Sequence, residues 1–154
     1  MLFDKDDENL IFTGSVSGGL FKSTNKGDNW ERVTSYFLNN SAIMSMTQSL
    51  NGTIFIGTGE SFTNRPNGDP FEPQVTGSGI YKSSDLGNSW TSINETNEFI
   101  HPSNLGTWTS TSYLTAHPTN TNILFAGTKN GLRFSTNAED QQPTFSSLPN
   151  TVLS

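Results

Sequence analysis

The stretch GSGIYKSSDLGNSW at residues 77–90 decides the fold, because its pattern occurs earlier as GGLFKSTNKGDNW at residues 18–30. In both copies a short apolar run opened by glycine leads into a polar turn that ends on tryptophan. A third copy, GLRFSTNAED at residues 131–140, keeps the apolar run and lacks the tryptophan. Such repetition indicates one structural unit that occurs three times, with loops of different length between the copies.

Each unit also contains an earlier apolar run that ends in glycine. These runs are NLIFTG at 9–14, GTIFIG at 52–57 and NILFAG at 122–127. Apolar or alternating segments at 30–33, 42–49, 90–93, 108–116 and 144–148 supply the other expected strands. Four short strands joined by tight turns form the blade of a β-propeller. We therefore expect an all-β chain, a propeller fragment of about three four-stranded antiparallel blades.

Composition and charge exclude several classes of protein. The chain has 154 residues, of which 31% are hydrophobic, and it contains 11 Phe, 3 Trp and 3 Tyr, which favours short strands over a helical bundle. A net charge of -6 repels nucleic acid. Without cysteine there is no disulfide and no thiolate zinc site, and no apolar run is long enough for membrane insertion. We expect no cofactor and no metal.

The repeated turn has the pattern S-x-D-x-G-x-x-W. Its members are Ser83, Asp85, Gly87 and Trp90 in the complete copy and Ser23, Asn25, Gly27 and Trp30 in the copy with asparagine. Asp or Asn at this place accepts hydrogen bonds from the N–H groups of the turn. The glycine allows positive φ, and the indole is expected to be buried between blades. We therefore expect Asp85 to lock the turn and not to act as a general acid.

This motif resembles the Asp-box (BNR) repeat of sialidase-like, sortilin-like and xyloglucanase-like propellers. With the GTGE stretch at 57–60 and the polar insert after it, the chain is also similar to uncharacterised secreted bacterial BNR-repeat proteins. The resemblance covers nearly the whole chain. It implies an extracellular or cell-surface location, although the N-terminus shows no signal peptide.

A count of the expected strands gives about two and three-quarter blades, while propellers typically close with 4–8. Blade one is expected at 1–38 without its innermost strand, blade two at 39–100 and blade three at 101–154. Open blade faces expose aromatic side chains and unpaired edges. We therefore expect the remaining propeller blades of a longer chain as partners, with assembly of several copies as the alternative.

Long connections on a rigid scaffold are the usual place for binding. We expect the insert at 59–75 and the connection at 94–107 to lie on the face opposite the repeated turns. The candidate ligand residues on this face are Glu60, Arg65, Asp69, Glu72 and Trp108. Aromatic groups beside carboxylates suit carbohydrate or peptide, and an ordered loop without a ligand is the other interpretation.

Two functions follow. The first is a non-catalytic propeller segment of an exported or cell-surface bacterial protein, serving as a recognition or structural scaffold. The alternative is part of a glycoside hydrolase, xyloglucanase-like or sialidase-like, whose catalytic pair is completed by missing blades. Most glycoside hydrolases need two paired carboxyl groups, and nothing in this sequence pairs them. A sialidase-like site needs three converging arginines and a tyrosine nucleophile, and we do not expect Arg32, Arg65 and Arg133 to converge, so we assign no catalytic residue. A photosystem-assembly-like propeller, with its basic patches, is disfavoured by the acidic charge.

Overall fold

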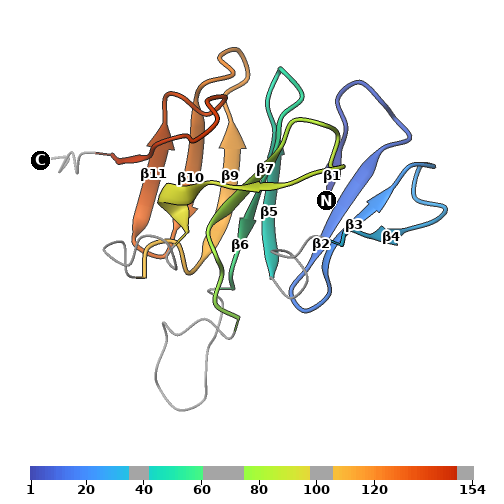
Figure 1. The fold of residues 1–154 in the computed structure, drawn as a ribbon, viewed down its shortest axis with the longest axis horizontal. Coiled ribbons are helices and arrows are strands. Elements are labelled where there is room, and N and C mark those ends of the chain that lie inside the picture. The colour runs from blue at the N-terminus through green and yellow to red at the C-terminus, as the bar shows by residue number, and fades with distance from the viewer. Residues whose placement is uncertain (35–41, 61–74, 98–105, 149–154) are drawn as a thin grey trace, which may run out of the picture.

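Three four-stranded antiparallel sheets stand side by side in the computed structural model, which describes residues 1–34, 42–60, 75–97 and 106–148 (Figure 1). The first sheet comprises β1 (Leu2–Phe3), β2 (Ile11–Ser15), β3 (Gly19–Ser23) and β4 (Glu31–Arg32). The second comprises β5 (Ile43–Gln48), β6 (Ile54–Thr58), β7 (Ile80–Ser83) and β8 (Thr91–Ser92). The third comprises β9 (Thr111–Ala116), β10 (Leu124–Thr128), β11 (Gly131–Ser135) and β12 (Ser146–Ser147).

The strands of every sheet follow one another in chain order, as in a propeller blade. The only helix among the described residues is the short 3-10 turn η1 (Asn94–Thr96). No helix in this part of the chain has the length and apolar character needed to cross a membrane. The expected all-β fold of three four-stranded blades is confirmed.

The expectation that the first blade lacks its innermost strand is wrong. Leu2 pairs with Phe12 and Phe3 pairs with Ile11, so β1 forms the inner edge of the first sheet. The sequence LF is too short to show a strand period, which is why the pattern did not reveal it. The two expected blade boundaries, after residue 38 and after residue 100, lie outside the described residues.

Two hydrophobic cores separate the three sheets. Between the first and second sheets, Phe12 and Leu20 pack with Ile54, Ile56 and Tyr81, all at most 1% exposed. Between the second and third sheets, the core residues are Phe55, Ile80, Ile93, Trp108, Leu114, Leu124, Ala126 and Ala138. Because side chains alternate along a strand, β6 sends its isoleucines to one core and Phe55 to the other. The middle sheet is therefore buried on both faces.

The second strand of one blade and the innermost strand of the next approach closely at the glycines that end the apolar runs. A Cβ on Gly14 would lie 2.6 Å from Cγ2 of Ile43 in β5, and a Cβ on Gly57 would lie 2.6 Å from the carbonyl oxygen of Thr111 in β9. Real side chains do not tolerate such distances. The recurring glycine therefore sets how closely the innermost strand of the next blade approaches the second strand of the previous one.

Candidate functional site

The turns between β3 and β4 and between β7 and β8 have the same hydrogen bonds at corresponding atoms. The hydroxyl of Ser83 donates to Asp85 Oδ1 at 2.8 Å and accepts the N–H of Gly87 at 2.8 Å. The N–H of Ser89 donates to the same carboxylate oxygen at 2.9 Å. In the first sheet the matching distances are 3.0, 2.9 and 2.9 Å, with Asn25 in place of the aspartate. An amide oxygen thus replaces the carboxylate without loss of the turn.

The backbone of the complete turn explains its glycine. Leu86 has φ of 58° and Gly87 has φ of 77°, so two consecutive residues lie in the left-handed region that favours glycine. A Cβ on Gly87 would also lie 2.5 Å from Cε1 of Phe12 in the first sheet. Both the backbone conformation and the contact with the neighbouring blade therefore exclude a side chain at this position.

The carboxylate of Asp85 is held in its ionised form. Its partial burial would raise the pKa, but hydrogen bonds from the hydroxyl and N–H of Ser89 and from the hydroxyl of Ser83 outweigh this effect and lower it. A group with a lowered pKa is a poor proton donor at neutral pH. The geometry and the direction of the shift both suit a group that stabilises the turn.

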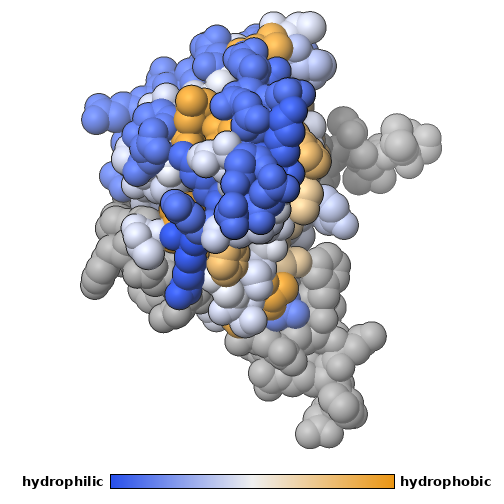
Figure 2. Space-filling view, turned by 90° about the vertical axis from the view of Figure 1, so that its right-hand side faces the viewer, coloured by the Kyte–Doolittle hydropathy of each residue, from blue (hydrophilic) through white to orange (hydrophobic). Residues whose placement is uncertain are grey.

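The tryptophans of the two turns have different surroundings. Trp90 packs against the first core, and its ring meets Phe12 edge to face, with centroids 6.3 Å apart. Trp30 is 38% exposed, so the expectation that its indole is buried between blades is wrong for this chain. Figure 2 views the end of the molecule formed by the first blade, where a largely hydrophilic surface is interrupted by separate hydrophobic areas. No described strand lies against this side of the first sheet.

The third turn, between β11 and β12, keeps the hydrogen bond from the serine hydroxyl of Ser135 to Asn137 Oδ1 at 3.0 Å but closes in a different way. Asn137 Oδ1 accepts the N–H of Thr144 at 3.0 Å, seven residues along the chain, whereas the other two turns close four residues along. Glu139 replaces the glycine, and its carboxylate accepts the hydroxyls of Ser49 and Thr53 from the second blade, both at 2.6 Å. The glutamate that replaces the glycine of the motif therefore forms hydrogen bonds with the neighbouring blade.

The structure describes only part of the ligand face expected from sequence. Arg65, Asp69 and Glu72 lie outside the described residues. Glu60 lies two residues after the end of β6, and its N–H donates to the carbonyl of Val75 at 3.0 Å. Trp108 is 3% exposed and packs edge to face on Phe145 in the second core, with centroids 5.1 Å apart. The proposed ligand contact of its indole is therefore a core contact.

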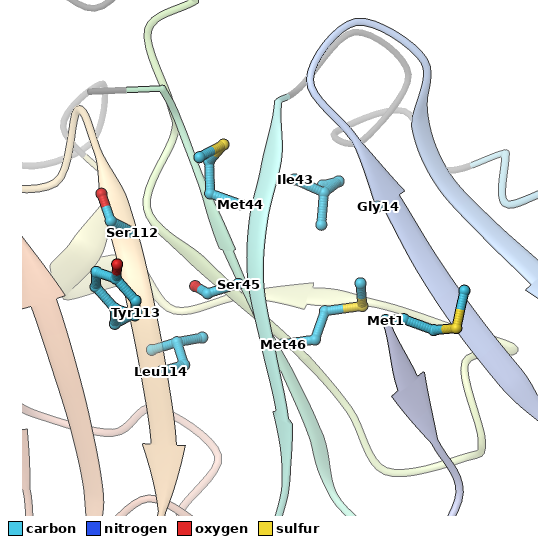
Figure 3. A pocket seen from close by; sticks show the side chains of 9 residues that line it. All are labelled: Met1, Gly14, Ile43, Met44, Ser45, Met46, Ser112, Tyr113 and Leu114. Atoms are coloured by element: carbon cyan, nitrogen blue, oxygen red, sulfur yellow. The ribbon is translucent and has the colours of Figure 1, made fainter. Parts of the chain in front are cut away.

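A groove that the sequence did not predict runs along the inner strands of the three blades (Figure 3). Its volume is about 310 Å³, and its lining residues are Met1, Gly14, Ile43, Met44, Ser45, Met46, Ser112, Tyr113 and Leu114. Figure 3 shows Ser45 of β5 between the phenol of Tyr113 on β9 and the thioethers of Met46 and Met1. Tyr113 is 69% exposed, so one face of its ring is open to a ligand.

The chemistry of this groove suits binding. Its described lining combines hydroxyl groups, thioethers and one phenol, and it includes no carboxylate or imidazole. A phenol ring offers a surface for stacking, and methionine adapts its shape to a ligand. Sequence could have located the groove through Met44, Met46 and Tyr113, because these residues lie in strands expected at the inner edge of the blades.

Two other titratable side chains, Glu95 and His117, form hydrogen bonds within the fold. Glu95 Oε2 accepts the N–H of Phe145 at 3.1 Å and so connects the second and third blades. His117 Nδ1 accepts the N–H groups of Thr119 and Asn120, each at 3.2 Å, within one turn. Among the residues that the structure describes, no three His, Asp or Glu side chains gather in a way that could hold a metal ion.

Comparison with known proteins supports the fold at low sequence identity. No family model and no curated protein matches the chain. A crystal structure of an ancestral GH74 enzyme is similar with a TM-score of 0.72 and 21% identity, covering 97% of this chain and 18% of that one. The GH74 enzyme of Niastella koreensis is similar with a TM-score of 0.61 and 21% identity, and the match covers 97% of this chain and 21% of that one. The structure of YCF48 bound to D1 peptide is similar with a TM-score of 0.56 and 17% identity, and the match covers 89% of this chain and 38% of that one.

The three sheets are thus blades of a β-propeller, the class that the strand order, the two cores and these neighbours define together. The chain spans about a fifth of the GH74 chains that it matches. At this identity the likeness extends to the fold alone.

Proposed function

We propose that the chain is an Asp-box (BNR) propeller segment of an exported or cell-surface protein, and that it recognises a ligand or supports the architecture without catalysis. The observation that carries this proposal is the use of the polar motif residues. The polar side chains of the motif form hydrogen bonds inside their own turns, through Ser83 and Asp85 in the second blade and Ser23 and Asn25 in the first. The carboxylate of Asp85 therefore stabilises the turn.

Recognition is assigned to the inner-strand groove, where an exposed phenol, two hydroxyls and several thioethers face one space. Both a sugar ring and an extended peptide have an apolar face and hydrogen-bonding groups that such a lining accommodates. In a full propeller ring the same strands surround the central axis. Further blades from a longer chain would complete the ring and the groove.

The test is a titration of the purified chain with ¹³C-labelled methionine methyl groups, using a xyloglucan heptasaccharide and an unrelated extended peptide as separate probes. A recognition role predicts shifts of Met44 and Met46 signals with one probe and their loss in Tyr113→Ala. The matched control is Leu50→Ala, since Leu50 is 51% exposed and lies outside the groove. Unchanged spectra with both probes would leave the architectural role and contradict recognition of these two ligand classes.

The second candidate is part of a glycoside hydrolase whose catalytic pair is completed elsewhere, and the similarity to two GH74 enzymes favours it. A non-catalytic segment releases no reducing sugar from xyloglucan or from a sialoside. Release that disappears in Glu60→Gln and persists in Glu31→Gln, a change at an exposed residue of β4, would establish the hydrolase instead.

A further inference from the structure

The interface between the second and third blades contains a small cavity that is separate from the inner-strand groove. Its volume is about 190 Å³, and the residues that line it are Glu95, Thr107, Trp108, Arg133, Phe145 and Ser147, none of which lines the groove. Glu95 belongs to η1, which follows the outer strand of the second blade and lies beside the third sheet (Figure 1), and Arg133 belongs to β11. The cavity therefore lies between two described sheets and not at either open face of the arc.

Arg133 occupies the position that Tyr81 has in the second blade. Tyr81 lies opposite Ile56 in its ladder and Arg133 lies opposite Ala126, and both of these partners belong to the core shared with the preceding blade. Because residues directly opposite each other lie on the same face of a sheet, the side chain of Arg133 points toward the second blade. Tyr81 is 1% exposed, and its hydroxyl lies 2.7 Å from Ser78 Oγ. A phenol with a satisfied hydroxyl thus completes one interface, and a guanidinium takes its place at the other.

The guanidinium of Arg133 forms no hydrogen bond or ion pair with any residue that the structure describes. The residue is half-buried, and Glu95 in the same cavity accepts the N–H of Phe145 at 3.1 Å. A charge that is partly removed from water without a partner costs free energy, and the phenol of the equivalent position avoids that cost. The packing of the blades does not require this charge, so the unpaired guanidinium indicates an anionic ligand.

We propose that this cavity binds one acidic sugar residue, a hexuronate whose carboxylate pairs with the guanidinium of Arg133. A planar carboxylate matches a guanidinium through two parallel hydrogen bonds. The carboxylate of Glu95 repels a second negative charge, so a ligand with one carboxylate is favoured over a dianion such as phosphate. The site goes beyond the proposed function, which assigns recognition to the inner-strand groove alone.

The rest of the lining suits the other parts of a sugar ring. Thr107 and Ser147 supply hydroxyl groups, and the ring of Phe145 is half-buried against Trp108. Thr107 Oγ1 accepts the side-chain amide of Asn130 at 3.2 Å, which leaves the hydrogen of this hydroxyl for a ligand. A sugar ring has hydroxyl groups at its rim and C–H groups on its faces, and such a lining accommodates both. The volume is smaller than the roughly 300–1,000 Å³ of sites for drug-sized ligands, so it suits a single ring.

A titration of the purified chain with ¹⁵N-labelled arginine side chains tests the proposal. The chain has three arginines, Arg32, Arg65 and Arg133, so their Nε–H signals can be assigned by substitution. Methyl glucuronide is the probe, and methyl glucoside, which has the same ring without the charge, is its control. We expect the Arg133 signal to shift with the glucuronide alone. In Arg133→Gln the affinity should fall about 10- to 100-fold, the loss expected for hydrogen bonds to a charged group.

Two further variants separate binding from stability. Lys129→Gln makes the same change in charge outside the cavity and should bind the glucuronide as the wild type does. Arg133→Tyr introduces the residue of the equivalent position, and we expect it to abolish binding without lowering the melting temperature. A melting temperature that falls in both Arg133→Gln and Arg133→Tyr would show that the guanidinium serves the fold and would overturn the proposal.

Three results of the titration would also overturn it. An Arg133 signal that is unchanged up to about 50 mM glucuronide would mean that no such site exists. Equal shifts with the glucoside would remove the role of the charge, and equal shifts with N-acetylglutamate would assign the cavity to an acidic peptide side chain instead of a sugar. Each of these results leaves the proposed function standing, because that function is tested through the methionines of the groove and the release of sugar.

Discussion

The two interfaces between blades occupy equivalent positions in the repeat and use different chemistry. The first is built on Trp90 and Phe12, with Gly87 allowing the rings to approach. The second has Glu139 and Gln142 at the glycine and tryptophan positions. Gln142 accepts the N–H of Asn94 at 2.8 Å, and Glu139 accepts two hydroxyl groups. Apolar contact at one interface is thus replaced by hydrogen bonds at the other.

This difference shows which part of the repeat is needed for blade packing. Phe12 and Phe55 are both 0% exposed, and each is covered by the next blade. Above Phe12 lies a glycine turn with an indole, whereas Ala138 belongs to the core that contains Phe55. The buried phenylalanine is the shared element, and the turn that covers it varies.

The largest expected effect comes from the shared element. Phe12→Ala removes a fully buried ring from the first core and should lower the free energy of unfolding by about 3–5 kcal/mol. Urea unfolding measures this loss. A loss below about 1 kcal/mol would mean that the first two blades do not depend on this contact.

The glycines of the two similar turns form a matched pair. Gly27→Ala imposes only backbone strain, at about 1–2 kcal/mol, since no described residue of another blade lies against it. Gly87→Ala adds a collision with Phe12 at 2.5 Å, and overpacking costs about 1–3 kcal/mol more. Thermal unfolding of the two variants compares them. Equal losses would show that the blade contact at Gly87 is absent in solution.

The variant Glu139→Ala tests how much the hydrogen bonds of the second interface contribute to stability. This variant leaves the hydroxyls of Ser49 and Thr53 without their carboxylate, and we expect a loss of about 1–3 kcal/mol in the free energy of unfolding. The control is Glu31→Ala on an exposed strand. If both variants lose the same small amount, the polar interface contributes nothing.

The acid of the complete turn gives a smaller effect that depends on pH. Asp85→Ala should cost about 0.5–2 kcal/mol, by analogy with a lost helix cap, and Asp85→Asn should cost less because Asn25 forms the same bonds. The pKa of Asp85 is lower in the folded than in the unfolded chain. Its stabilisation is therefore present above the unfolded pKa and is lost as the pH falls through the folded pKa.

The measurement is the melting temperature between neutral and acidic pH for the wild type and Asp85→Asn. The pKa of Asp4 is lowered as well, since hydrogen bonds from Gln48, Asp6 and Asp7 outweigh the effect of burial, so part of the acid loss persists in the variant. If the melting temperatures of the wild type and Asp85→Asn fell equally with pH, the loss of stability in acid would come from other carboxylates and not from Asp85.

The repeat made most of the fold predictable, because glycine, apolar runs and tryptophan recur at fixed offsets. The strand β1 was not predictable, since two residues carry no period. The burial of Trp108 was not predictable either. Its expected place directly after the connection at 94–107 suggested exposure, while its ring fills the second core beside Phe145. The groove was missed because methionine and tyrosine on inner strands look like core residues until the blades are placed around them.

The central claim is that the tryptophan of one blade packs on the phenylalanine of the blade before it. A double-mutant cycle between Phe12 and Trp90 tests it, with the Phe12 and Trp30 pair as reference. We predict a coupling of about 0.5–1.5 kcal/mol for the first pair, as for other edge-to-face aromatic pairs, and none for the second. Absence of coupling between Phe12 and Trp90, or equal coupling of Phe12 to both tryptophans, would contradict the account.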